Sequence, residues 1–416
     1  MKNFDGIIGY QKEKAEILQI CDMLKNREYY EGLGAKLPRG VLIEGEPGVG
    51  KTLLATAFLK ESGLKSYVVR RSRKGGEFAE ALERIFEEAK ANQPSIVLLD
   101  DMDKFTINDK NREEYVAVQT CIDSVKGENV FVIATVNETK NIPDSLLRAG
   151  RFDRRIRMKV PRGKDSYNII SYFMDQKGFL PETNRDDVAK MLEGNTCAEL
   201  ETVINEAAIY AGYERKDKIE LEHLVRAYLK QRFNFDAFDE DEDPKELEMV
   251  AYHEAGHLIV LDIIKEGSVG LASISAQDGG FVKRCETLKR RPYEVLVALA
   301  GKAAAELKYG WVASGAMSDI RKATSMVSDG YGDSATGGFA LADVSRFHES
   351  PDATHQREIV TSARTEEYLF KAKEIIAANM EYLEKVARAL IEKRVLLNSD
   401  VKKIRESVVI KHVDIA

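Results

Sequence analysis

The feature that most limits how this chain can fold is a glycine-rich sequence at residues 45–52, Gly-Glu-Pro-Gly-Val-Gly-Lys-Thr. An apolar stretch at 41–43 comes directly before it, and a helical pattern from Leu53 to Glu61 follows it. In a strand–loop–helix unit of this kind, glycines let successive backbone N–H groups turn toward phosphate oxygens without side-chain clashes. The motif therefore predicts a nucleotide-binding loop inside an α/β fold. The residues expected to hold the nucleotide are Glu46, Pro47, Gly48, Val49, Gly50, Lys51, Thr52 and Leu53.

Alternating strand and helix patterns extend through the first part of the chain. Apolar stretches at 67–69, 96–99, 130–133 and 156–158 are strand candidates, and helical patterns separate them. This alternation predicts an α/β domain over residues 1–163, with a parallel sheet covered by helices on both faces.

Two carboxylates end the strand candidate 96–99, where a nucleotide-hydrolysing site needs them. Lys51 is expected to reach the β- and γ-phosphates, and Thr52 to bind Mg²⁺. Asp100 is placed to complete the magnesium shell, and Asp101 to orient the attacking water. Asn137 could help to position that water, although a single asparagine after a strand is ordinarily only a turn residue.

Two arginines, Arg148 and Arg151, form a further candidate group in Leu-Arg-Ala-Gly-Arg-Phe-Asp. Phosphoryl transfer gains from a guanidinium group brought to the γ-phosphate, often from a neighbouring molecule. On spacing alone, two surface arginines in a turn are the simpler interpretation.

Three more regions follow. Helical periodicity predicts a small helical subdomain over residues 164–235. The acidic run Phe238–Pro244 predicts a linker, 236–245, because like charges repel and proline ends regular structure; a solvated start of a helix fits the run equally well. Residues 246–416 read as a mostly helical domain.

That last domain contains His-Glu-Ala-Gly-His at residues 253–257. His253 and His257 are four residues apart on a predicted helix, so both imidazoles can point at one metal ion, with Glu254 beside them to take a proton from water. Gly256 inside the helix indicates close packing there. Two surface histidines are the alternative, and a third ligand is still required. On spacing alone Asp319 is simply a carboxylate at the start of a helix.

Composition narrows the partners and the compartment. The net charge of −7 argues against a nucleic-acid binder. The four cysteines contain no Cys-x-x-Cys pair and suggest free thiols in a reducing, cytoplasmic compartment. No apolar run has the length of a membrane span, and the first residues do not form a signal peptide, so a soluble chain is expected.

Over nearly its whole length the sequence resembles the FtsH family of AAA+ zinc proteases. The matching stretches, in family order, are 37–42, the phosphate loop, 147–154, 205–208, 251–257 and 315–320. The resemblance implies that Asp319 is the third Zn²⁺ ligand, that Asn137 is the nucleotide sensor, and that Arg148 and Arg151 reach a neighbour's ATP. It also implies Mg²⁺, a homohexameric ring and unfolded protein substrates. It places Ile8, Gly9 and the segment from Gly194 to Ala198 beside the adenosine.

The chain departs from the family pattern in three places. Family members usually carry N-terminal membrane spans, whereas this chain begins almost at the ATPase domain; that suggests a soluble variant or a truncated one, and leaves room for a membrane or adaptor partner. Asp101 stands where glutamate is usual, which predicts slow ATP turnover because the carboxylate is one methylene shorter. The pore loop reads Lys74-Gly75-Gly76 within a basic stretch, so it predicts weak pulling or a preference for acidic segments, with Phe78 as a weak substitute for the missing aromatic residue. A solvated charged loop explains this basic stretch equally well.

Together these features predict an ATP-dependent zinc endopeptidase that draws in unfolded or loosely folded proteins. Two alternatives stay open. One is an ATP-modulated peptidase with weak unfolding power, and the other is a non-proteolytic remodelling ATPase.

Overall fold

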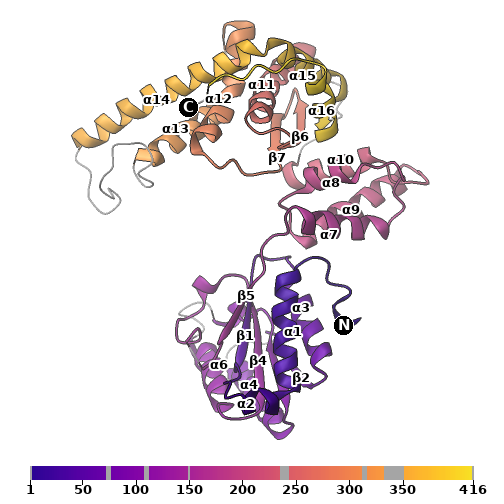
Figure 1. The fold of residues 1–416 in the computed structure, drawn as a ribbon, viewed down its shortest axis with the longest axis vertical. Helices are drawn as coiled ribbons and strands as arrows, with labels where there is room; N and C mark the ends of the chain where they lie inside the picture. The colour runs from indigo at the N-terminus through magenta and orange to yellow at the C-terminus, as the bar shows by residue number, and fades with distance from the viewer. Residues whose placement is uncertain are drawn as a thin grey trace. The chain divides into compact units, whose positions relative to one another are not determined.

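The computed structural model describes residues 2–71, 76–106, 112–148, 150–234, 243–311, 316–331 and 351–414. The chain forms two compact units, which are described separately here (Figure 1). The first comprises Met1–Gly178 and Gly194–Asn205, and the second comprises Phe179–Glu193 and Glu206–Ala416.

The first unit is built on a five-stranded parallel sheet. Its strands are β1 (Gly40–Glu44), β2 (Lys65–Val69), β3 (Ser95–Leu99), β4 (Val130–Val136) and β5 (Arg154–Arg157), in the order β2-β3-β4-β1-β5. Every residue of β1, β3 and β4 is buried, as expected for strands covered on both faces. The predicted parallel α/β sheet is confirmed.

Helices cover both faces of this sheet. On one face α4 (Gly76–Ala91) and α6 (Arg112–Ser124) pack on Val97 and Leu99 of β3. On the other lie α1 (Gln11–Lys25) and α3 (Lys51–Ser62), toward which Ile96 and Leu98 point by strand alternation (Figure 1). The shorter elements of this unit are a 3₁₀ helix at Lys2–Phe4, α2 (Arg27–Gly32), α5 (Asp103–Thr106) and a 3₁₀ helix at Thr139–Asn141.

The segment predicted to be helical contains four helices: α7 (Lys164–Asp175), α8 (Arg185–Leu192), α9 (Cys197–Tyr213) and α10 (Leu221–Phe233). The start of α8 has a local cause, because Asn184 accepts hydrogen bonds from the backbone N–H groups of Asp186 and Asp187. The helix α7 and the start of α9 belong to the first unit, whereas α8 and α10 belong to the second.

The second unit is mostly helical, as predicted. Its further helices are α11 (Pro244–Ile264), α12 (Arg291–Tyr309), α13 (Met317–Tyr331), α14 (Pro351–Ala378), α15 (Met380–Lys393) and α16 (Asn398–Glu406). Asp243 caps α11 by accepting from the Lys245 N–H, and Pro244 fills the first helical position. Apolar residues on nearly every side of α11 are buried, so this helix forms the centre of the core.

A small antiparallel sheet, which the sequence patterns did not predict, lies beside α11. It consists of β6 (Val269–Ser275), β7 (Gly279–Arg284) and β8 (Val395–Leu397), in the order β7-β6-β8. Within the described part of the chain β7 pairs only with β6, so its other edge is open.

Three sequence expectations concern segments at the limits of the described residues. Lys74 and Gly75 of the expected pore loop lie outside them, and Gly76 begins α4. The acidic run of the expected linker also lies outside them up to residue 242. Phe78 is 3% exposed and packs with Leu82 and Phe86, so the idea that it replaces a pore aromatic is wrong. Across the described helices, none combines the length and apolar character needed to cross a membrane.

Candidate functional site

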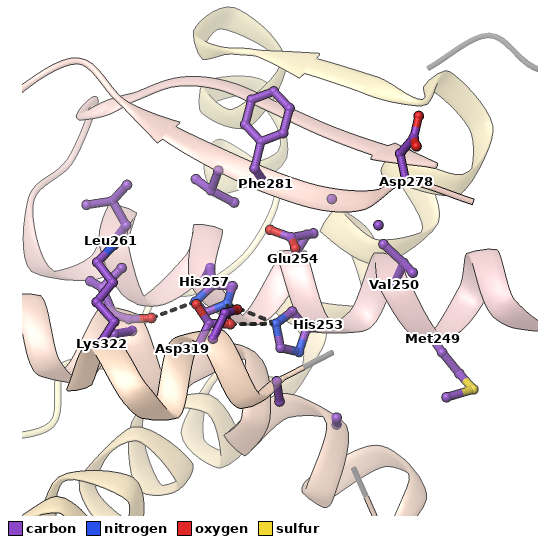
Figure 2. Close-up of a pocket in the computed structure, with 18 of the residues that line it drawn as sticks. Met249, Val250, His253, Glu254, His257, Leu261, Asp278, Phe281, Asp319 and Lys322 are labelled. Atoms are coloured by element: carbon purple, nitrogen blue, oxygen red, sulfur yellow. Dashed lines mark hydrogen bonds and ion pairs between the residues drawn. The ribbon is translucent and has the colours of Figure 1, made fainter. Parts of the chain in front are cut away.

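Three predicted metal ligands meet where α11 passes the first turn of α13. The Nε2 atoms of His253 and His257 lie 3.1 Å apart, and Oδ2 of Asp319 lies 3.1 and 3.2 Å from them (Figure 2). Donors of a tetrahedral site with bonds of about 2.0–2.1 Å are separated by roughly 3.3 Å. The three atoms therefore have the spacing that one small cation requires.

The surroundings of this cluster also fit a cation. Nδ1 of His257 lies 2.6 Å from the carbonyl oxygen of Val297, which can only accept a hydrogen bond, so Nδ1 carries the proton and Nε2 presents a lone pair. On α12, a Cβ atom added at Gly301 would lie 2.4 Å from Nε2 of His257 and 2.5 Å from Nε2 of His253. The glycine thus keeps free the space in which an ion would sit. Two imidazoles and one carboxylate are a donor set typical of catalytic zinc, with a fourth position left for water.

Charge complementarity holds the cluster together. Burial alone would raise the pKa of Asp319, but hydrogen bonds from His253 and His257 outweigh it and lower that pKa. Burial alone would lower the pKa of His257, but the bond to Asp319 and the charge of Glu254 raise it. The carboxylate therefore attracts positive charge to this point, which a divalent cation would supply in place of a proton.

Glu254 lies between α11 and β7, next to the metal cluster (Figure 2). Its carboxyl is buried, and burial raises its pKa. A Cβ atom on Gly280 would come within 2.5 Å of Cγ of Glu254, so the absence of a side chain on β7 lets the carboxyl sit there. A carboxyl with a raised pKa beside a metal-activated water can accept a proton and later return it.

The predicted close packing at Gly256 is confirmed. A Cβ atom at this position would lie 2.5 Å from the carbonyl oxygen of Ala300 and 2.6 Å from Cβ of Ala304. The helices α11 and α12 therefore approach closely where the metal ligands are mounted.

A cleft of 930 Å³ opens over this cluster. Apolar side chains from several elements line it, among them Met249, Val250, Phe281, Tyr309 and Trp311. An extended peptide would fit along it beside the open edge of β7.

The second site surrounds the phosphate loop of the first unit. Nζ of Lys51 donates to the carbonyl oxygens of Gly45 and Glu46 at 2.8 and 3.0 Å, and to Oδ1 of Asn137 at 3.0 Å. Burial lowers the pKa of Lys51. Thr52 donates to Oδ1 of Asp100 at 2.8 Å. The structure thus brings together the predicted phosphate, magnesium and sensor residues.

The two carboxylates after β3 each have a basic neighbour. Nε of Arg70 lies 3.0 Å from Oδ2 of Asp100, and Nζ of Lys104 lies 2.6 Å from Oδ2 of Asp101. Asp101 has a positive φ of 54°, which few residues other than glycine adopt readily. Arg70 and Lys104 were not singled out for this site from the sequence.

A pocket of 850 Å³ adjoins the phosphate loop. Ile8 and Ala198 line it, as predicted, together with Tyr10, Tyr172 and Cys197, which the sequence did not suggest. Gly9 and Gly194 do not line it; both have positive φ angles and shape the turns on either side. An adenine ring would find apolar and aromatic surfaces here.

Comparison with known proteins agrees with both sites. Residues 41–160 match the ATPase family associated with various cellular activities (AAA), and residues 241–404 match peptidase family M41. The chain is 30% identical to the ATP-dependent zinc metalloprotease FtsH of Caldicellulosiruptor bescii, with 96% of this chain and 71% of that protein covered. The chain belongs to the FtsH family of ATP-dependent zinc metalloproteases.

Two other relatives bear the same name. The FtsH of Leptotrichia buccalis is 30% identical and that of Mycoplasma genitalium is 32% identical, each over 96% of this chain. This chain spans 56% and 62% of their lengths. Family membership gives the chain Zn²⁺, ATP and Mg²⁺ as cofactors. The cluster of His253, His257 and Asp319 has the donor atoms that a zinc ion requires, and the phosphate-loop pocket has the groups that a nucleotide requires.

The two arginines of this FtsH-family chain have different surroundings. Arg151 is largely buried and pairs with Asp123, Nε to Oδ1 at 3.0 Å and the terminal nitrogen to Oδ2 at 2.6 Å. It also donates to the carbonyl oxygen of Ser145. Arg148 is exposed. Of these two arginines, only Arg148 is exposed to solvent in this conformation.

Proposed function

We propose that this FtsH-family chain works as an ATP-driven endopeptidase. It would assemble as a homohexamer, draw unfolded or loosely folded proteins through the ATPase ring, and hydrolyse their peptide bonds. The observation that carries this proposal is the position of Glu254 beside the His253, His257 and Asp319 cluster, in a cleft of 930 Å³.

Different residues of the chain have different roles in peptide hydrolysis. His253, His257 and Asp319 would hold the zinc ion, which would supply Lewis acidity toward water and the substrate carbonyl. Glu254 accepts the proton of the attacking water and passes it to the departing amine nitrogen. Burial of Glu254 supports this shuttle, because its raised pKa lies closer to the working pH than that of an exposed carboxyl.

The cleft favours an extended substrate. A peptide added along the open edge of β7 would bond through its main chain and place one carbonyl over the metal cluster. A folded helix or hairpin cannot offer its backbone in this way. Unfolding must therefore precede cleavage, and an attached ATPase would supply it.

The ATPase half would act between subunits. Arg148 is exposed and has no ion-pair partner among the described residues, so it is the better candidate to reach a neighbour's γ-phosphate, whereas Arg151 would fix the turn that carries it. Asn137 is held by Asp103, whose Oδ2 accepts from its Nδ2 at 2.8 Å and from its backbone N–H at 3.1 Å. These two bonds leave Oδ1 free to accept from Nζ of Lys51, at 3.0 Å.

Two observations favour a weaker motor. Asp101 is paired with Lys104, and Phe78 is buried and unable to grip a polypeptide. An ATP-modulated peptidase with little unfolding power is the second candidate. It would cut unfolded chains with little need for ATP and fail on folded ones.

A cleavage assay tests both candidates. One substrate is permanently unfolded, and the other is stably folded with an unstructured tail. Each is followed with ATP, with ADP and without nucleotide, with Glu254→Gln as the inactive control. Cleavage of both substrates only with ATP supports the unfoldase-protease. Cleavage of the unfolded substrate alone, whatever the nucleotide, supports the weaker motor, and no cleavage by the wild type refutes both.

A further inference from the structure

The two ends of the metal cleft carry opposite charges. Lys322 lies on α13 one turn after the metal-cluster residue Asp319, so it projects from the same face of the helix. Figure 2 places it near Leu261, beyond His257 along α11. Among the described residues it has no ion-pair partner. The other basic side chain of the lining, Arg284, is neutralised by Glu294 at 2.8 Å.

Carboxylates lie at the opposite end. Asp278 is exposed in the turn before β7, and Figure 2 places it near Val250. Glu246 lies in the first turn of α11, seven residues before His253, which is two helical turns or about 10 Å away along the axis. Neither carboxylate has a basic partner among the described residues. The cleft therefore runs from a negative end, past the metal cluster, to a positive end.

The direction of β7 determines which end of a bound peptide would lie at each charged end of the cleft. From Asp278 to Phe281, the strand runs toward the end where Lys322 and Leu261 lie (Figure 2). A substrate strand that pairs antiparallel to β7, the more stable arrangement, would run the opposite way. Its N-terminal part would lie near Lys322, and its C-terminal part near Asp278 and Glu246.

We propose that the cleft selects its cleavage sites by charge: acidic residues on the N-terminal side of the scissile bond and basic residues on its C-terminal side. Lys322 determines the first preference, and Asp278 with Glu246 the second. This inference rests on the proposed proteolytic function of the same site.

Three fluorogenic peptides with identical apolar residues around the scissile bond test the preference. One carries glutamates before the bond and lysines after it, one has these residues exchanged, and one has glutamine at all these positions. Because exposed charge pairs are each worth only a few tenths to about 1 kcal/mol, the first peptide should have a kcat/KM about fivefold above that of the second. This ratio should shrink as salt is added.

Two charge-reversal variants complete the design. Lys322→Glu should bring the ratio to one or below, while Lys411→Glu, an equal charge change on the exposed C-terminal segment, should leave it as in the wild type. Cut positions are read by mass spectrometry, and zinc content and circular dichroism are checked for each variant. Equal rates for the two charged peptides, preference for the exchanged peptide, or an unchanged ratio in Lys322→Glu would overturn the proposal.

Binding separates this inference from the proposed function. If the wild type cuts none of the peptides, the proposed function fails. Fluorescence anisotropy of the three peptides on Glu254→Gln then still measures the charge preference. The inference is supported if Glu254→Gln binds the first peptide most tightly and the double variant Glu254→Gln, Lys322→Glu does not. Equal binding of all three peptides refutes it.

Discussion

Arg70 forms an ion pair with one carboxylate oxygen of Asp100, while two threonines donate hydrogen bonds to the other. Its Nε lies 3.0 Å from Oδ2, and Oδ1 accepts from Thr52 at 2.8 Å and from Thr135 at 2.9 Å. The carboxylate expected to complete a magnesium shell is thus satisfied by protein groups. Magnesium must compete with Arg70, which directly follows β2.

Removing that competitor should lower the magnesium requirement. Arg70→Ala should bind ATP at a Mg²⁺ concentration about threefold lower, since the Arg70 side chain is 66% exposed and such pairs are worth at most about 1 kcal/mol. A magnesium titration at fixed fluorescent ATP analogue measures the midpoint. Arg84→Ala, on the outer face of α4, is the control and should match the wild type. A midpoint that stays the same or rises in Arg70→Ala would contradict the competition.

The carboxylate at position 101 should limit ATP turnover. Asp101→Glu should hydrolyse ATP about tenfold to a hundredfold faster, because a displacement of about 1 Å at a catalytic group can cost on the order of a hundredfold. Steady-state ATPase rates at saturating ATP and Mg²⁺ provide the measurement, with Asp144→Glu in an exposed turn as the control. A wild type faster than Asp101→Glu would show that the shorter side chain is no handicap.

Arg148 should act on a neighbour's nucleotide. Arg148→Ala should lose most of its ATPase activity, on the order of 10³-fold for a guanidinium at the γ-phosphate. Mixing it with Lys51→Ala, itself inactive, should restore part of the rate, because some interfaces then combine an intact Lys51 with an intact Arg148. If mixing restores nothing while the two proteins co-assemble, Arg148 works within its own subunit or not at all.

Gly301 should be essential for zinc. The methyl group of Gly301→Ala would fall 2.4–2.5 Å from both imidazole Nε2 atoms. We expect zinc affinity to fall by about a hundredfold or more, as for other disturbances next to metal ligands, with helix content retained. Zinc per chain by plasma mass spectrometry and circular dichroism measure the two quantities. Gly212→Ala, in a helix with open space around the position, should keep its zinc. A Gly301→Ala protein with full zinc occupancy would show that the ligands can move aside.

ATP should protect Cys197 from alkylation. Cys197 lines the nucleotide pocket and burial raises its pKa, so little thiolate exists near neutral pH. Its alkylation rate without nucleotide should still be rising above pH 9, where an ordinary thiol is already mostly ionised. Mass spectrometry of peptides after timed alkylation should show slower labelling with ATP. Cys21 and Cys121, whose pKa values burial raises to about 12, serve as internal references, since nucleotide should not change their slow labelling. Equal labelling of Cys197 with and without ATP would exclude it from the binding surface.

The phosphate-loop and histidine motifs could be recognised in the sequence because each lies within one strand–loop–helix unit or one helix. Lys51 and Thr52 follow β1 directly, and His253 and His257 share one helical face. Asp319 was reached only through family resemblance, since 62 residues separate it from His257 and no local pattern connects them.

The rest depended on tertiary contacts. The strand β8 has only three residues and joins its sheet from the far end of the chain, so no local pattern connects it with β6 and β7. Arg70 and Lys104 look like solvated charges until folding places them on Asp100 and Asp101. Gly301 looks like any glycine in a helix, because its role depends on how close α12 comes to α11.

The close approach of Gly256 to Ala300, and of Gly301 to the two histidines, restricts how this metal centre could be transferred to another protein. Grafting residues 253–257 onto a helix of another scaffold would transfer two of the three ligands without the room they need. A workable transplant would have to carry a second helix, with its own glycine at the crossing, and a third helical turn that supplies the carboxylate, so the smallest portable form of this metal centre takes pieces of three helices.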